Sequence, residues 1–157
     1  MTSDALRSEI LAFLAAHNVI HLATVADGLP HVASLFYVND GFTLYWVSDP
    51  ATRHSREVAS SPRVAATVAP EYGSYTDIRG LQIVGRAARV EGLAGTSAGL
   101  ALLAGKFNFF KDFMRGPVAL VERLGKAAIY RLDIERVTFI DNTKGFGHKD
   151  VLELAVS

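Results

Sequence analysis

The sequence contains no cysteine. This absence excludes disulfide bonds, thiolate chemistry and cysteine-ligated metal sites. No apolar run approaches the roughly 20 residues that a membrane-spanning helix needs. The first ten residues include Asp4 and Glu9, where a secretory signal would carry basic and then apolar residues. We therefore expect a cytoplasmic protein without a membrane span.

The chain also lacks a surplus of charge, because 16 basic residues balance 16 acidic ones. A protein without a net field has no long-range attraction for nucleic acid or for an anionic membrane. Half of the 157 residues are hydrophobic, which is typical of a globular protein that can build a core without covalent links. We expect a single domain over residues 1–157.

Several catalytic and metal-binding patterns are missing as well. The histidines are scattered and form no HExxH pattern, so no metal site is predicted. No G-x-S-x-G element supports a hydrolase. The stretch KGFGHK at residues 144–149 lacks the third glycine of a dinucleotide fingerprint and the spacing of a P-loop. No catalytic residue can be assigned from the sequence.

What the chain does contain is a succession of strand-like segments. Asp27-Gly28 and Asn39 to Gly41 are turn sequences between β-branched and aromatic runs, which is typical of an antiparallel meander. Strands are predicted at residues 19–26, 31–38, 42–48, 63–69, 78–91 and 128–140, with a turn and a last strand in the tail. Helices are predicted at residues 3–16, 51–60 and 96–110, the last with further turns to 115.

The order of these segments predicts the fold. The first strands follow one another in hairpin order, whereas a parallel α/β fold needs regular strand–helix alternation. We therefore predict a mainly β (α+β) protein, an antiparallel barrel of meander or Greek-key order with peripheral helices. Closing the barrel removes strand edges that a chain rich in Val, Leu and Ile would otherwise have to protect.

The densest basic cluster lies in the sequence DPATRHSREV, where a predicted strand ends and a helix begins. With Thr52 as N-cap, the helix would direct free backbone N–H groups and its positive dipole end toward this point, a combination that binds phosphate. Thr52, Arg53, His54 and the preceding Ser48 could add donors. A capped surface helix with solvated charges is the alternative, and spacing alone does not decide between the two.

Residues 21–91 resemble the FMN-binding split-barrel family that includes pyridoxamine 5′-phosphate oxidase. In that family, strands similar to HVASLFYV and FTLYWVSDP precede a turn of the type Ser/Thr-x-Lys-x-x-Asn. Here His54 stands at the lysine position and Glu57 at the asparagine position. The segment DIRGLQIVGRAARVEG is similar to the long strand of the family. Together with TRH and a C-terminal F-x-DNT-x-GFG-x-K pattern, it resembles an uncharacterised bacterial branch, and only residues 96–123 lie outside the likeness.

The resemblance implies FMN as cofactor and a homodimer with flavin at the subunit interface. It implies that a first group of residues holds the phosphate: Ser48, Thr52, Arg53 and His54, next to Val47. It implies that backbone groups of a second set lie along the isoalloxazine ring: Ala33, Ser34, Leu35 and Phe36. Gln82 would reach the flavin from the other subunit, and Asn142 and Lys149 are candidate second-subunit contacts.

The function that follows from the resemblance is an FMN-dependent oxidoreductase with an unknown small-molecule substrate. Activity as a true pyridoxamine-phosphate oxidase is not expected, because the C-terminal Trp and Arg elements of those oxidases are missing and the single tryptophan is Trp46. Two alternatives remain open. One is a flavin-binding protein without turnover, such as a store or a redox sensor, and the other is a haem-binding relative of the same fold.

Overall fold

The computed structural model describes residues 1–115 and 126–155, the side chains of 112–115 excepted. Eight strands form one sheet: β1 (Val19–Ala26), β2 (Leu29–Phe36), β3 (Val38–Asp40), β4 (Thr43–Ser48), β5 (Arg63–Val68), β6 (Arg79–Arg89), β7 (Ala128–Asp141) and β8 (Lys149–Glu153). The helices are α1 (Ser3–Ala16), α2 (Arg53–Ser60), α3 (Leu93–Lys106) and α4 (Asn108–Arg115), with 3₁₀ turns η1 (Tyr75–Asp77) and η2 (Asn142–Lys144).

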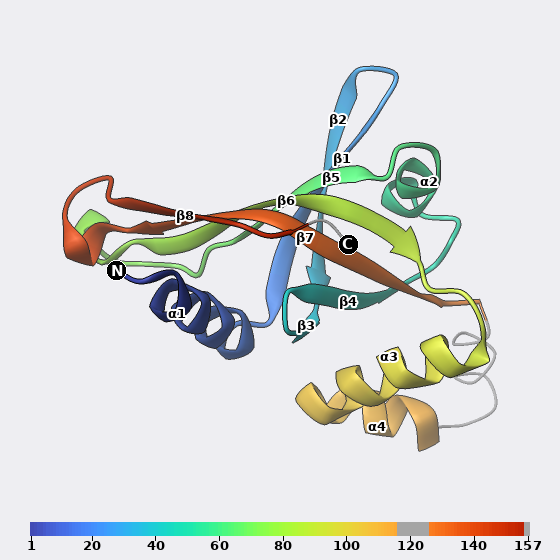
Figure 1. The fold of residues 1–157 in the computed structure, drawn as a ribbon. Coiled ribbons are helices and arrows are strands. Elements are labelled where there is room, and N and C mark those ends of the chain that lie inside the picture. The colour runs from blue at the N-terminus through green and yellow to red at the C-terminus, as the bar shows by residue number, and fades with distance from the viewer. Residues whose placement is uncertain (116–125, 156–157) are drawn as a thin grey trace.

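The sheet confirms the predicted antiparallel, mainly β architecture. Its order is β2-β1-β5-β6-β7-β4-β3, with β8 paired to β7, and every pairing is antiparallel. The strands curl into a half-barrel with the helices around it (Figure 1). The predicted Asp-Gly turn joins β1 to β2, and both of its residues adopt positive φ, 52° at Asp27 and 73° at Gly28, as a two-residue hairpin turn of this type requires.

Three local predictions differ from the structure. The strand predicted at 31–38 is two strands, because Tyr37 separates β2 from β3 and is itself fully buried. The helix predicted at 96–110 begins at Leu93 and breaks at Phe107, whose φ of −120° and ψ of 112° are extended. That break buries the Phe107 ring beside Phe110 in a second hydrophobic cluster. Ser3, a residue type that favours helix starts, is the N-cap that the sequence predicts for the helix at 3–16. The N-cap of α1 is instead Thr2, since the Thr2 hydroxyl accepts from the Ala5 N–H.

The hydrophobic core fills the concave side of the sheet. Alternate residues of each strand point inward, as the burial pattern of β1 and β4 shows. α1 adds its buried face to the same core. The side chains in this core that are completely buried include Ile10, Leu14, Ile20, Leu22, Tyr37, Leu44, Trp46, Leu81, Leu132, Val137 and Phe139.

The C-terminal end of α1 is tied to α3 by polar contacts. The Tyr37 hydroxyl donates to the Leu14 carbonyl at 2.6 Å, and the Lys106 amine donates to the His17 carbonyl at 2.5 Å. The same amine lies 4.3 Å from the centre of the Tyr37 ring. Burial lowers the pKa of Lys106 to about 8 and raises the pKa of Tyr37. These contacts satisfy carbonyl groups that the end of a helix leaves without partners.

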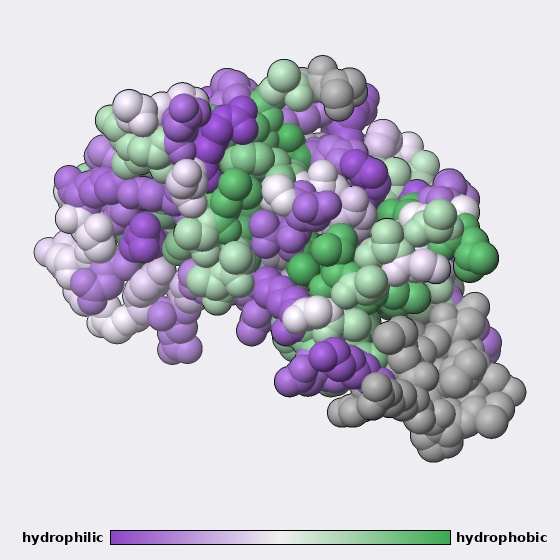
Figure 2. All heavy atoms as spheres, turned by 60° about the horizontal axis from the view of Figure 1, so that its bottom comes forward, coloured by the Kyte–Doolittle hydropathy of each residue, from purple (hydrophilic) through white to green (hydrophobic). Residues whose placement is uncertain are grey.

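Hydrophobic residues reach the surface in the right half of Figure 2. Phe36 of β2 and Phe109 of α4 are both exposed, and their ring centres lie 5.3 Å apart. Among the described residues, no helix is both long enough and apolar enough to cross a membrane.

The pairing of β6 with β7 contains a bulge that bends the sheet. The register shifts between Val84 and Gly85, so that no residue of β6 stands directly opposite Glu135 in the backbone pairing. Gly85 lies so close to β7 that a Cβ atom at this position would stand 2.2 Å from the Asp133 carbonyl oxygen and 2.9 Å from Leu132. Only a residue without a side chain fits this approach, and a bulge of this kind increases the local bend and twist of a strand pair.

Replacing Gly85 with alanine should therefore destabilise the protein, because the new methyl group meets backbone that cannot move aside independently. Overpacking of this kind costs about 1–3 kcal/mol of unfolding free energy, which urea denaturation can measure. Gly105→Ala is the matched control, since a Cβ there meets nothing within 4 Å and the residue lies in α3. Equal stability of the two variants would show that the close approach does not constrain the fold.

Candidate functional site

The candidate site lies at the start of α2, immediately after β4. Thr52 is the N-cap residue, as predicted, but its side chain makes no capping bond to the helix. Its hydroxyl donates instead to the Asp49 carbonyl at 2.8 Å, and its backbone N–H bonds the same oxygen at 3.0 Å. The hydroxyl is turned away from the N–H groups of the first helical turn, which have no intrahelical acceptor.

Three of the predicted residues converge at this point. The Ser48 hydroxyl lies 2.7 Å from His54 Nε2, and the Thr52 hydroxyl lies 3.2 Å from the same nitrogen. The Thr52 hydroxyl is also 3.3 Å from the Ser48 hydroxyl and 2.8 Å from the Ser55 hydroxyl. Ser48, His54 and Ser55 are buried. Sequence spacing could not show that β4 and α2 bring these groups into direct contact, and it did not identify Ser55.

The surroundings of His54 favour its neutral form. Burial lowers the pKa of His54 below its ordinary value of 6.5, and the charge of His31 on β2 lowers it further, while the Glu57 carboxylate acts in the opposite direction. A neutral imidazole can accept a hydrogen bond at Nε2 from the Ser48 hydroxyl, which lies 2.7 Å away. A protonated one would donate to an anion in the same place. His54 Nε2 can therefore accept a hydrogen bond when the imidazole is neutral and donate one to an anion when the imidazole is protonated.

Arg53 is bound by the carboxylate of Glu57. In the sequence, Glu57 is notable only because it stands where the family pattern has asparagine. Arg53 Nε donates to Glu57 Oε1 at 2.9 Å, and the Thr24 hydroxyl of β1 donates to Glu57 Oε2 at 2.6 Å. Glu57 is 7% exposed, whereas the Arg53 side chain is 49% exposed. The hydrogen bond from Thr24 and the bond and charge of Arg53 lower the pKa of Glu57. The i, i+4 spacing of an arginine and a glutamate was the one signal available in the sequence.

The predicted ring-binding residues lie on β2, at one end of the strand order. An edge strand directs the backbone groups of alternate residues away from its only neighbour. Ala33 and Leu35 face the same side as the buried Leu22 and Ile20 of β1, while Ser34 and Phe36 face the other side. The Ser34 hydroxyl bonds His21 at 2.9 Å. α2 contacts both β1 and β2, which brings this edge near the start of the helix.

Gln82 lies on the opposite face of the sheet from Thr24. Its neighbours Leu81 and Ile83 point into the core, and Gln82 is exposed on the convex side beside Thr67. It lines a pocket of about 370 Å³, together with Thr67, Ala69, Pro70, Tyr72, Ile78, Arg79, Gly80 and Ile140. The chain therefore does not bring Gln82 to its own α2 site.

The two C-terminal candidates lie near the turn between β7 and β8, Asn142 in η2 and Lys149 in β8. The Asn142 amide donates to the Tyr75 carbonyl at 2.7 Å and accepts from the Gly147 N–H at 3.0 Å, so it holds this turn against η1. Lys149 is exposed at the first position of β8. Neither residue lies on β4 or α2, where the site begins.

Val47 and Trp46 contribute to packing around the site. Val47 packs against the hydrophobic cluster of α3 and α4. Trp46 is completely buried and stacks on Tyr130 with ring centres 5.9 Å apart, and its Nε1 has no hydrogen-bond partner. Trp46 is therefore a core residue.

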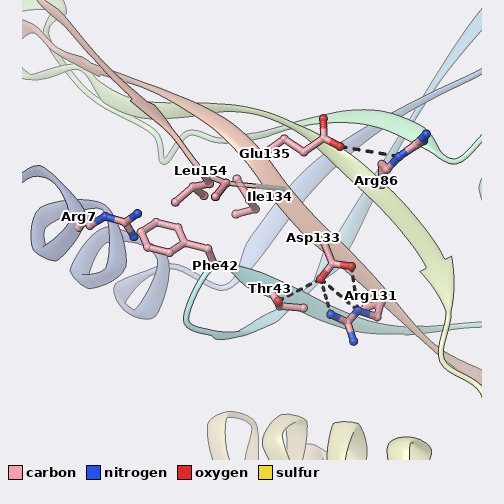
Figure 3. A pocket seen from close by; sticks show the side chains of 10 residues that line it. Arg7, Phe42, Thr43, Arg86, Arg131, Asp133, Ile134, Glu135 and Leu154 are labelled. Atoms are coloured by element: carbon pink, nitrogen blue, oxygen red, sulfur yellow. Dashed lines mark hydrogen bonds and ion pairs between the residues drawn. The ribbon is translucent and has the colours of Figure 1, made fainter. Parts of the chain in front are cut away.

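A second polar pocket, of about 460 Å³, lies where α1, the β3–β4 turn and β7 meet (Figure 3). It contains none of the predicted residues. Figure 3 shows Asp133 directed toward Arg131 and Thr43, and Arg86 toward Glu135. Because most of its arginines already face carboxylates, this pocket carries little uncompensated charge. In the described part of the chain, no group of three His, Asp or Glu residues is placed to hold a metal ion.

Comparison with known proteins gives a family and a set of relatives. The family model of pyridoxamine 5′-phosphate oxidase matches residues 6–141. UPF0306 protein YhbP of Salmonella schwarzengrund is 32% identical over 139 residues, which cover 87% of this chain and 86% of the relative.

Solved structures share the fold at lower identity. An FAD-binding protein from Mesorhizobium loti has a TM-score of 0.64 at 22% identity, covering 84% of this chain and 91% of the other. A heme binding protein from Mycobacterium smegmatis has a TM-score of 0.71 at 20% identity, covering 94% of this chain and 57% of the other. The same fold therefore occurs with both kinds of cofactor.

Proposed function

Because the chain belongs to the pyridoxamine 5′-phosphate oxidase family, we propose that it binds FMN and acts as an oxidoreductase on a small molecule. The observation that carries this proposal is the convergence of Ser48, Thr52 and His54 at the start of α2, where the helix is not capped by a side chain. Hydroxyl, imidazole and backbone N–H donors at one point fit a phosphate group. These donors support the phosphate reading over a solvated surface helix, because Ser48 and His54 are buried.

In this proposal the chain supplies binding and orientation. Ser48, Thr52 and His54 hold the phosphate, and the half-exposed side chain of Arg53 adds a charge-assisted contact. The edge of β2, from Ala33 to Phe36, offers unpaired backbone groups to the polar edge of the ring. A bound flavin supplies the electron-transfer chemistry. No described residue is assigned as a catalytic acid, base or nucleophile, so the donor and the acceptor of electrons stay unassigned.

A homodimer is part of the same proposal. The convex face of the sheet carries a row of small apolar residues in register across four strands: Val32, Ala23, Ala65 and Val84. Val32 is 62% exposed and Val84 is 39% exposed. Apolar side chains exposed in a continuous row are typical of an interaction surface. Gln82 lies on this face, so pairing of two copies through it would carry each Gln82 toward the other chain, as the family resemblance implies.

The haem alternative has less support from the site. A haem ligand needs an open nitrogen, whereas His54 Nε2 is held between two hydroxyl groups in a buried position. The absorbance spectrum of the purified protein distinguishes the two cofactors, because a flavin and a haem have different visible bands. Oxidation of NADH or NADPH with added FMN then separates an enzyme from a flavin store.

Arg53→Ala should weaken FMN binding, because it removes a charge-assisted hydrogen bond to the phosphate. The expected loss is roughly 1.5–3 kcal/mol, or ten- to hundredfold in affinity, measured by titrating the apoprotein with FMN. Arg56→Ala is the control, since Arg56 is an exposed arginine of the same helix and is not one of the residues that converge at its start. If Arg53→Ala and Arg56→Ala bind FMN as tightly as the natural chain, the basic cluster is surface decoration.

FMN affinity should fall as pH rises, because His54 loses its proton and with it the charge that attracts the phosphate. Burial and His31 lower this pKa in the free protein, and a nearby phosphate raises it, so binding takes up a proton between the two values. The dissociation constant then increases from below pH 6.5 upward, by at most about tenfold per pH unit. His54→Gln should flatten the profile. Parallel profiles for the natural chain and the variant would exclude His54 as a phosphate ligand.

Ala65→Glu should convert the proposed dimer into a monomer, because it places a charge in the middle of the apolar row. Sedimentation velocity measures the change directly. Ala98→Glu, at an exposed position of α3, controls for the added charge. A variant Ala65→Glu that sediments like the natural chain would show that this face is not the dimer interface.

A further inference from the structure

The carboxylate of Glu57 stands between α2 and β1 and touches one residue of each. Thr24 on β1 donates to one of its oxygens at 2.6 Å, and Arg53 Nε on α2 donates to the other at 2.9 Å. Thr24 is 3% exposed and Glu57 is 7% exposed. A buried carboxylate needs hydrogen-bond partners, and here both of its oxygens have one.

This arrangement restricts the conformation of Arg53. An exposed arginine normally samples many rotamers, and fixing it on a ligand costs conformational entropy. The bond to Glu57 engages Nε and leaves the two terminal nitrogens of the guanidinium group available. Thr24 on β1 holds Glu57, and Glu57 holds Arg53. The orientation of the Arg53 guanidinium group therefore depends on β1 as well as on α2.

We propose that Thr24 and Glu57 are positioning residues that hold Arg53 in place to receive the phosphate of the ligand. We call the three residues the Thr24–Glu57–Arg53 clamp. The proposal rests on the proposed function, because it assumes a phosphate-bearing ligand at the start of α2. The clamp goes beyond the proposed function, because it assigns a role to a glutamate at a position where the family pattern has asparagine.

The sign of one measurement separates positioning from simple electrostatics. A negative charge near the site repels an anionic ligand, so neutralising Glu57 should by charge alone strengthen binding of a phosphate. If the clamp matters more, neutralising Glu57 replaces the charge-assisted bond to Arg53 with a weaker one, loosens the arginine and weakens binding. The two accounts therefore predict opposite changes for the same substitution.

The decisive variants are Glu57→Gln and Thr24→Val, each titrated with FMN as apoprotein beside the natural chain. Both should bind FMN roughly three- to tenfold more weakly, because the orientation of a charge-assisted donor is lost. Thr24→Ser keeps the hydroxyl and should restore most of the affinity. An unchanged or higher affinity of Glu57→Gln and Thr24→Val overturns the clamp.

A double-mutant cycle tests whether the effect passes through Arg53. In the Arg53→Ala background, Glu57→Gln should no longer weaken binding, since the group that it positions is absent. A loss of the same size in both backgrounds contradicts the proposal and indicates a general structural effect. Thermal unfolding of each variant identifies any that does not fold. If Glu57→Gln does not fold, the comparison of Thr24→Val with Thr24→Ser tests the clamp by itself.

A readout without flavin comes from NMR of the apoprotein. The Nε–H signal of Arg53 should be protected from solvent exchange in the natural chain and in Thr24→Ser, and should exchange faster in Thr24→Val. Failure of the natural chain to bind FMN overturns the proposed function and the clamp together. FMN binding that depends on Arg53 but not on Glu57 or Thr24 overturns the clamp alone.

Discussion

The close approach of β6 to β7 at Gly85 is the constraint on which the rest of the structure depends. These two strands form the most extensive pairing in the sheet, and the register shift beside Gly85 bends them together. The bend lets β1 and β5 continue one side of the half-barrel while β4 and β3 continue the other. β2 and β3 stand at the two ends of the strand order and are joined through the buried Tyr37, so the sheet has to curl to bring its ends together beside the core.

The candidate site is a consequence of this curvature. β4 ends at Ser48, and the chain turns through Asp49 into α2, which packs against β1, β2 and β6. The polar side chains at this junction are enclosed by strands, so they must bond to one another or to a guest. Ser48, Thr52 and His54 satisfy each other at distances of 2.7–3.3 Å. A set of donors that can exchange partners in this way is suited to receiving an anion.

Local sequence signals predicted most of the fold. The turn at Asp27-Gly28, the alternation in β7 and the bounds of α1 and β1 agree with the structure, because each depends on neighbours within a few residues. The errors lie where burial of a distant contact overrides local pattern. Tyr37 ends β2 because its hydroxyl reaches the Leu14 carbonyl of α1, and α3 ends before Phe107 because that ring packs beside Val38 and Ile129. No local spacing contains these partners.

The amino-acid sequence by itself determined the kind of donors at the start of α2, the mainly β, antiparallel architecture and the family. It could not determine which of those donors are buried together. Nor could it determine that Arg53 is bound by Glu57 and is not fully exposed to solvent. Thr24 precedes Glu57 by 33 residues, and only the packing of α2 on β1 brings their side chains within 2.6 Å. The physical reason is that residue type decides which bonds a group can make, while tertiary structure decides which partner is within reach.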